Sequence, residues 1–342
     1  MARASVLVLY NQPLLAMDHP DAESEHTVVA IAEHLARILN EEGFRADLLA
    51  LAPDPALLWH TLQRHKPDVV FNLYEGNLDN ADTESYVAGL LDWAGVPYTG
   101  SPFATLTLAR MKHLTKYLLK GAGLPTADFQ VVHRLPAPAC VLPFPVIVKP
   151  AAQDASIGMD QKSVCTSQAE VAERVRYLLA TYGAPVLIEE YIPGREFNVA
   201  LMELPELEAL PLAEIVLPAE KPGSWSILTY AGKWKVGTPE YDETPSRFPT
   251  DLSVAAVAEL NRLAMTTYRL LGCRDYARVD FRMRPDGRAY ILEVNPNPEI
   301  SEDANFTGCL GSARRSHREF IVRLVNQALS RKHVSKPTFA PL

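Results

Sequence analysis

The chain has 342 residues, of which 48% are hydrophobic and 22% are charged, and its formal net charge is −8. This length exceeds what a single hydrophobic core usually serves, so we expect two or three folding units. The acidic balance, with no lysine-rich or arginine-rich tract, argues against nucleic acid or an anionic membrane as the main partner. A nucleotide needs only a few local cations and stays compatible with this composition.

The cysteines and the N-terminus indicate a cytoplasmic protein. The four cysteines are scattered without a Cys-x-x-Cys pair, which favours small buried hydrophobic residues in a reducing compartment over a zinc site or a disulfide framework. The apolar run at residues 5–10 is too short for a signal peptide or a membrane span.

The first hundred residues alternate strands and helices. Apolar runs predict strands at 5–10, 46–49 and 69–73, and helical spacing of apolar residues predicts helices at 25–42, 57–66 and 84–94. This order implies a parallel sheet covered by helices on both faces. No Gly-x-Gly-x-x-Gly follows the first strand, so the dinucleotide fingerprint is absent.

The rest of the chain predicts two further units. The second contains a helix at 104–120, strands at 129–132, 145–150 and 186–191, a small-residue loop at 151–158 and a helix at 167–182. The third is expected to be mostly antiparallel, with a Pro/Gly-rich loop at 218–249 and helices at 254–271 and 316–329, followed by a frayed tail at 332–342. We therefore predict domains at 1–101, 102–188 and 189–342.

Three oxygen-bearing side chains near the C-terminus predict a metal site. The segments 277–281 and 290–295 are predicted to be strands joined by a hairpin turn at Pro285-Asp286-Gly287. Because side chains alternate along a strand, Glu293 and Asn295 share a face, and Asp280 on the partner strand can meet them. Such ligands suit Mg²⁺, with Mn²⁺ as a second option. The alternative is a polar outer face of a sheet.

Five sequence pieces, in this order, resemble the D-alanine–D-alanine ligase family of ATP-grasp carboxylate–amine ligases. The similarity extends over about residues 5–329. The pieces are Pro-Tyr-Thr-Gly-Ser at 97–101, Lys112 with Gly-Ala-Gly-Leu-Pro at 121–125, Val-Ile-Val-Lys-Pro at 146–150, Leu-Ile-Glu-Glu-Tyr-Ile-Pro-Gly-Arg-Glu-Phe at 187–197, and Ala-Arg-Val-Asp at 277–280 with Leu-Glu-Val-Asn at 292–295.

The resemblance implies an α/β, ATP-grasp fold with an N-terminal parallel-sheet (pre-ATP-grasp) domain. It also implies an ATP-dependent ligase that forms a peptide or amide bond through an acyl phosphate, and a homodimer. Its substrates would be small molecules, an amino acid or carboxylate and an amine. A nucleotide-binding protein without ligase activity is an alternative from another class, and the joint presence of Arg278, Asp280, Glu293 and Asn295 argues against it.

The resemblance also implies roles for individual residues. Phosphate or nucleotide contacts would come from Lys112, Lys149 and Lys233, adenine contacts from Glu189 and the backbone around Glu190 and Ile192, and a ribose contact from Glu196. Arg278 would stabilise negative charge that develops in the transition state. The alternatives are solvated lysines, exposed glutamates at a strand end, and a structural ion pair between Arg278 and Glu293.

The amino-acid half departs from the family pattern. Ala155 stands where the first of two loop serines is usual, next to Ser156, and Trp234 replaces a tyrosine after Lys233. An N-terminal glutamate that orients the substrate would be Glu23 or Glu25. After Asn295, three acids, Glu299, Glu302 and Asp303, stand where small hydroxyl residues usually hold an acceptor carboxylate. If these acids face the site, they favour a cationic acceptor, so an amide ligase with a different amine is the main alternative to D-alanyl-D-alanine synthesis.

Overall fold

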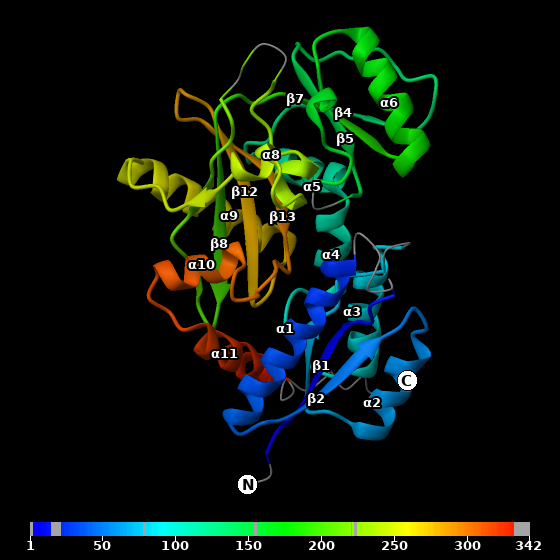
Figure 1. Ribbon diagram of the computed structural model, residues 1–342, viewed down its shortest axis with the longest axis vertical. Helices are drawn as coiled ribbons and strands as arrows, with labels where there is room; N and C mark the ends of the chain where they lie inside the picture. Colours follow the sequence, from blue (N-terminus) through cyan, green and yellow to red (C-terminus); the bar gives the residue numbers. More distant parts are fainter. Residues whose placement is uncertain are drawn as a thin grey trace, which may run out of the picture.

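The computed structural model describes residues 3–14, 22–77, 80–153, 156–219, 221 and 224–331, with side chains in the first helix described from Thr27 onward. Three β-sheets organise the chain: an N-terminal sheet at the bottom of Figure 1 and two further sheets above it. Every helix among the described residues is too short or too polar to cross a membrane.

The N-terminal sheet is parallel, as its alternating strands and helices predict. Val6 and Val8 face one side and pack with α1, whereas Leu7 and Leu9 face the other side and pack with α2 and α3. Helices therefore cover both faces. The strand order is β2-β1-β3, and the bounds are β1 (Ser5–Asn11), α1 (Ala22–Glu41), β2 (Arg45–Leu51), α2 (Ala56–His65), β3 (Val69–Leu73) and α3 (Thr83–Ala94).

The prediction of one long helix at 104–120 is wrong, because the helix is interrupted at Met111. Helix α4 (Phe103–Arg110) ends there, and α5 (Lys112–Gly121) begins in a new direction because Met111 has a ψ of 78°. The Lys112 backbone N–H instead donates to the carbonyl of Ala151, at 2.9 Å. The break lets α4 pack on α3 while α5 packs on α9, and it brings Lys112 close to the loop after β5.

The middle sheet is antiparallel and has one helix-covered face. Helix α6 packs Val171, Val175 and Leu178 against Val148 and Ile188 of the strands. The opposite face carries Ile147, Lys149 and Glu189, since Ile147 pairs with Glu189 across the strands. The strand order is β4-β7-β5-β6, and the bounds are β4 (Phe129–Val132), β5 (Val146–Pro150), η1 (Gln161–Ser163), β6 (Val164–Cys165), α6 (Gln168–Tyr182) and β7 (Val186–Glu190).

The third sheet is antiparallel, as expected, and contains the predicted hairpin between β12 and β13. Helix α9 covers one face, with Leu260, Leu263 and Tyr268 against Val279 and Phe281. The order is β11-β10-β8-β12-β13 with β9 beside β8, and the bounds are β8 (Arg195–Glu203), β9 (Leu207–Ala209), β10 (Ala213–Ile215), β11 (Ser246–Arg247), α9 (Val254–Leu271), β12 (Tyr276–Met283) and β13 (Ala289–Asn295).

The predicted loop at 218–249 is only partly irregular. Two short helices, α7 (Tyr230–Trp234) and α8 (Pro239–Asp242), lie within it. Each begins at a threonine whose hydroxyl accepts a backbone N–H, Thr229 from Gly232 and Thr238 from Tyr241. Lys233 therefore lies on a helical turn.

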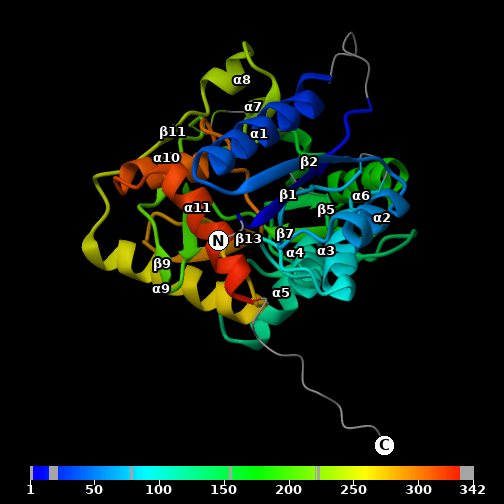
Figure 2. The ribbon, with the colours of Figure 1, turned by 90° about the horizontal axis from the view of Figure 1, so that it is seen from below.

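The C-terminal helices return to the first sheet. Helices α10 (Asn305–Ser312) and α11 (His317–Ser330) share a core with β1, β3 and α1, and Figure 2 shows α11 close to α1. The three sheets support, as a proposal, the domain boundaries 1–101, 102–188 and 189–342. Strand β7 crosses the second boundary, and α11 packs on the first domain.

A buried charge cluster joins α5 to the middle sheet. The Glu189 carboxylate on β7 is 3.2 Å from Lys116 Nζ and 3.1 Å from Lys149 Nζ. Both Glu189 and Lys116 are 1% exposed. Lys116 Nζ also donates to Thr126 Oγ1 at 2.8 Å, and that hydroxyl donates to the Ile291 carbonyl on β13. One carboxylate thus serves as the counter-charge of two lysines where the middle and third sheets meet.

Burial and charge act in opposite directions on this cluster. Burial lowers the pKa of Lys116 to about 8, although Glu189 acts to raise it. Burial alone would raise the pKa of Glu189, but Lys116 and Lys149 outweigh it and lower the pKa. Glu189 is therefore a buried carboxylate and is not the exposed strand-end glutamate considered as an alternative.

We predict that Glu189→Gln lowers the free energy of unfolding by about 3 kcal/mol, because the buried Lys116 and the partly buried Lys149 lose their shared counter-charge. Urea denaturation of the full chain measures this loss. Glu190→Gln is the matched control: the neighbouring carboxylate pairs with Arg284 in a partly exposed position, and its loss is expected to cost less than about 1 kcal/mol. Equal stability of the two variants would contradict the counter-charge role.

Candidate active site

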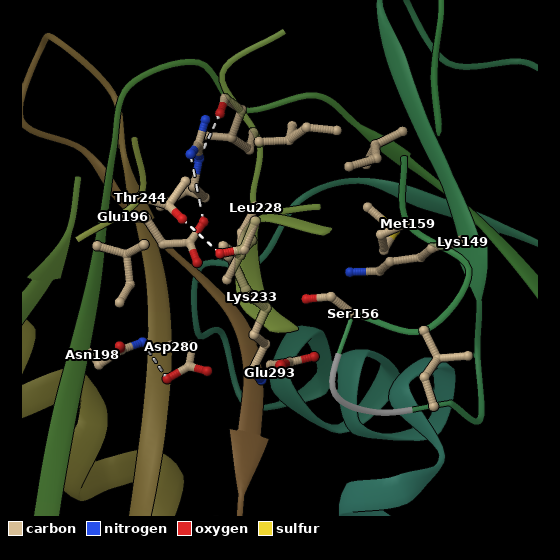
Figure 3. A pocket seen from close by; sticks show the side chains of 18 of the residues that line it. Lys149, Ser156, Met159, Glu196, Asn198, Leu228, Lys233, Thr244, Asp280 and Glu293 are labelled. Carbon is tan, nitrogen blue, oxygen red and sulfur yellow. Dashed lines mark hydrogen bonds and ion pairs between the residues drawn. The ribbon is translucent and has the colours of Figure 1, made fainter. Parts of the chain in front are cut away.

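A cleft of about 700 Å³ lies between the middle sheet and the third sheet. Side chains from β5 and β7 line one wall, and side chains from β8, β12 and β13 line the other (Figure 3). Nine of the predicted site residues with described side chains line it: Lys112, Lys149, Ser156, Glu189, Glu190, Ile192, Glu196, Lys233 and Arg278. The predicted metal ligands Asp280 and Glu293 line it as well.

Strand register places the two carboxylates opposite each other. Asp280 on β12 pairs with Glu293 on β13, and on its other side Asp280 pairs with Asn198 on β8. The Asn198 amide donates to Asp280 Oδ1 at 2.7 Å. Sequence reasoning missed Asn198, although it follows Glu196 by two positions and therefore shares its face of β8.

Arg278 forms its ion pair with Asp280. Its Nε and Nη2 donate to the two oxygens of that carboxylate at 2.7 and 2.8 Å. The structural pair with Glu293 that was considered as an alternative is therefore not the one formed. A bidentate pair orients the guanidinium in the cleft and leaves its remaining donors available.

Asn295 occupies a different position from the two carboxylates. It pairs with Arg278 in the strand register, and its Oδ1 accepts the backbone N–H of Asn297 at 3.2 Å. It is not among the residues that line the cleft. The structure thus brings Asp280 and Glu293 together, and it places Asn295 at the end of β13, outside the lining of the cleft.

Cations surround Glu293. Lys112 Nζ lies 3.2 Å from its carboxylate and also donates to the Gln153 carbonyl at 2.7 Å. Burial alone would raise the pKa of Glu293, but Lys112, Lys149, Lys233 and Arg278 together lower it to about 2. Because this folded-state pKa lies below the ordinary value, the stabilisation is present above about pH 4.5 and is lost as the pH falls through about 2.

The remaining nucleotide candidates are held by arginines. Glu190 pairs with Arg284, and the Ile192 carbonyl accepts Arg282 Nε at 3.1 Å. Glu196 lies 3.5 Å from Arg282 Nη1, and burial raises its pKa although Arg282 acts to lower it. These residues follow one another along β7, the following turn and β8, where the two walls of the cleft meet.

Lys233 and Ser156 face the cleft from short segments. Burial, together with the charge of Arg278, lowers the pKa of Lys233. Its Nζ lies 5.4 Å from the Trp234 ring centroid, and Trp234 is 44% exposed. Ser156 has a φ of 60°, and in Figure 3 its side chain and that of Lys149 both point into the cleft.

Some predicted residues lie outside what the structure describes. Ala155 falls outside the described residues, and so do the side chains of Glu23 and Glu25, whose backbone lies in the first turns of α1. The choice between the two glutamates stays open.

The three acids after Asn295 separate in space. Asp303 lines the cleft, whereas Glu299 lines a small cavity beside β3 and α1. Glu302 is 70% exposed and faces His34. Glu75, which sequence reasoning missed, lines the same cavity as Glu299. Although part of this side chain is exposed, desolvation of its carboxyl and the charge of Glu299 raise its pKa to about 7.

Comparisons with known proteins agree with this geometry. Residues 118–326 match the family model described as D-ala D-ala ligase C-terminus. The chain is 31% identical over 306 residues to uncharacterized protein y4sG of Sinorhizobium fredii, covering 87% of each chain. It is 30% identical over 313 residues to a D-alanine–D-alanine ligase of Gluconobacter oxydans, covering 90% of this chain and 96% of the relative.

A solved structure confirms the predicted ATP-grasp fold. The D-alanine–D-alanine ligase from Bacillus anthracis complexed with ATP aligns with a TM-score of 0.73 at 18% identity, over 96% of this chain and 99% of that one. Together, the family match over residues 118–326 and the relative from Gluconobacter oxydans show that the chain belongs to the D-alanine–D-alanine ligase family of ATP-grasp ligases.

Proposed function

We propose that the chain joins a carboxylate to an amine other than D-alanine, through an acyl phosphate formed with ATP. The observation that carries the ATP-dependent step is a cleft that Asp280 and Glu293 line together with Lys112, Lys149 and Lys233. Phosphoryl transfer depends mainly on positioning and on neutralising phosphate charge, and this cleft has groups for both tasks.

The nucleotide would lie between the two walls. Lys149 and Lys112 present ammonium groups toward phosphates from β5 and α5, and Lys233 adds a third from α7. Glu189, Glu190, the Ile192 backbone and Glu196 would hold the base and ribose, since they line the part of the cleft where β7 turns into β8. Their arginine and lysine partners keep these carboxylates in place.

A divalent metal fits the donor set of this wall. Asp280 and Glu293 offer hard oxygen ligands from adjacent strands, and such ligands suit Mg²⁺ or Mn²⁺. Asn295, two positions after Glu293, would add an amide oxygen only by turning into the cleft and leaving the Asn297 N–H that it accepts. When bound, such an ion neutralises phosphate oxygens. Arg278, held by Asp280, would stabilise the charge that develops as the amine attacks, while Ser156 and an N-terminal glutamate would orient the substrates.

The acceptor side favours a cationic amine. Asp303 lines the cleft, and Glu299 and Glu75 line the small cavity beside β3 and α1. Desolvation is the larger cause of the raised pKa of Glu75 and the charge of Glu299 adds to it, so a cation beside the two carboxyls would stabilise their ionised forms. An acceptor with a second, protonated amine would supply that cation, whereas the carboxylate of D-alanine would be repelled. Assembly as a homodimer remains a prediction from the family.

We predict that Asp280→Asn or Glu293→Gln lowers turnover at least about tenfold at limiting Mg²⁺, because each change removes a charged ligand. The rate of ADP release with a turned-over substrate pair measures this. Asp286→Asn, in the exposed turn of the same hairpin, serves as the control and should keep the wild-type rate. Wild-type turnover in both ligand variants would remove the metal assignment.

Lys149→Met is expected to weaken ATP binding by about tenfold or more and to slow turnover, since a cation that faces the phosphates is lost while its bulk is kept. Calorimetric titration with ATP checks this, and exposed Lys162→Met, outside the cleft, should bind ATP as the wild type does. Unchanged ATP affinity and turnover in Lys149→Met would place Lys149 outside the nucleotide site.

D-alanine alone is expected to be a poor substrate. The missing hydrogen bonds from serine and tyrosine to its charged groups would weaken its binding about ten- to a hundredfold, and repulsion by the acids adds to that loss. Initial rates of ADP release across a panel of amines, with mass spectrometry of the products, test this. Efficient formation of D-alanyl-D-alanine at ordinary concentrations would refute the proposed acceptor.

A pair of neighbouring acids gives the matched control for this panel. Asp303→Asn should lower kcat/KM for the preferred cationic amine, because Asp303 lines the cleft. Glu302→Gln, assayed with Mg²⁺ and without any transition-metal ion, should leave it unchanged, because Glu302 does not line the cleft. A fall of similar size in both variants would indicate a general electrostatic effect in place of a contact with the acceptor.

A further inference from the structure

A second group of metal-ligating side chains lies outside the cleft, where α1, α11 and the segment after β13 meet. His34 lies on α1, and His317 is the first residue of α11. Glu302 lies in the segment between β13 and α10. One ligand atom of each residue falls within 4.8 Å of the others. None of the three lines the cleft, so this group is spatially separate from the proposed ATP site.

The separation of His34 and Glu302 suits a bridging ion. His34 Nε2 is buried and has no hydrogen-bond partner among the described residues. It lies 3.6 Å from Glu302 Oε1, which is too far for a good hydrogen bond. Two ligands of one tetrahedral zinc ion, each bonded at about 2.0–2.2 Å, are roughly 3.3–3.6 Å apart.

His317 is held in a way that is common among metal-binding histidines. Its Nε2 lies 2.8 Å from the Ile300 carbonyl. A carbonyl can only accept, so Nε2 carries the proton, and the lone pair of the neutral ring is on Nδ1. A backbone carbonyl that fixes the ring orientation and tautomer is the usual outer contact of a ligating histidine. The His34 and His317 rings are nearly parallel, with centroids 6.1 Å apart.

We propose that His34, His317 and Glu302 form a site for a divalent transition-metal ion of the Zn²⁺ class. Two imidazoles and one carboxylate suit such an ion, and three protein ligands leave a position for water. Mg²⁺, which prefers oxygen ligands, would favour the cleft instead. The two sites therefore differ in ligand chemistry as well as in place.

The position of the site indicates a structural clasp. An ion there would connect α1 of the N-terminal unit to α11 and to the segment that carries Asp303 into the cleft. Arg318 already joins α11 to α1 through Glu41 and Glu42, so the ion would reinforce an existing contact. Glu302, with most of its surface in water, can move to close the coordination sphere.

Titration of the full chain with Co²⁺ tests the site, after removal of any affinity tag and without nucleotide. Ligation by histidine in a four-coordinate site produces visible absorption bands, and Zn²⁺ should abolish them by competition. We expect one equivalent of Co²⁺, and at least about tenfold weaker binding in His34→Gln and in Glu302→Gln. His113→Gln, which alters a histidine paired with His133 elsewhere, should bind Co²⁺ as the wild type does.

Two further measurements keep the outcome unambiguous. Zn²⁺ should raise the Tm of the wild type and of His113→Gln, and it should leave the Tm of His34→Gln unchanged. Circular dichroism checks that each variant is folded. Glu293→Gln should bind Co²⁺ like the wild type. The proposal is overturned if wild-type protein shows no stoichiometric bands, or if binding survives in His34→Gln and is lost in Glu293→Gln. Neither result depends on the proposed ligase reaction.

Discussion

The cleft depends on balancing buried charge. Phosphate binding needs cations, but lysines placed in a poorly hydrated cleft repel one another and lose hydration energy. Glu189 on the middle sheet offsets the charges of Lys116 and Lys149. Glu293 on the third sheet offsets the charge of Lys112. These two carboxylates offset part of the positive charge and hold the ammonium groups in place, so the site is organised for an anionic ligand.

Strand pairing makes this balance possible. Glu189 and Lys149 lie on neighbouring strands of one sheet, and Asp280, Glu293 and Asn198 lie on three neighbouring strands of the other. Helices α6 and α9 cover the opposite faces with apolar side chains. Each sheet therefore has one dry face that stabilises the unit and one polar face that forms a wall of the cleft.

The two halves of the site have different relationships to the family. The nucleotide wall holds its charged residues in one cleft, next to Arg278 fixed by Asp280. On the proposed acceptor side there are acids, of which Asp303 lines the cleft and Glu299 lines a small cavity together with Glu75. In the proposed reaction, the same neutralisation of ATP charge could be combined with a different amine, because separate segments of the chain would hold the two substrates.

Local patterns in the sequence were sufficient to predict the parallel first sheet, from the order of its strands and helices, and the β12–β13 hairpin, from its turn residues. They also predicted that Asp280 could meet Glu293, because side chains alternate along a strand with a period of two residues. Only the tertiary structure placed Lys116 beside Glu189, Asn198 beside Asp280 and Glu302 beside His34. It also broke the predicted helix at Met111, since packing on α3 and α9 outweighed local helix propensity. Ion pairs between distant segments depend on how sheets and helices pack, and no local pattern in a single chain encodes that packing.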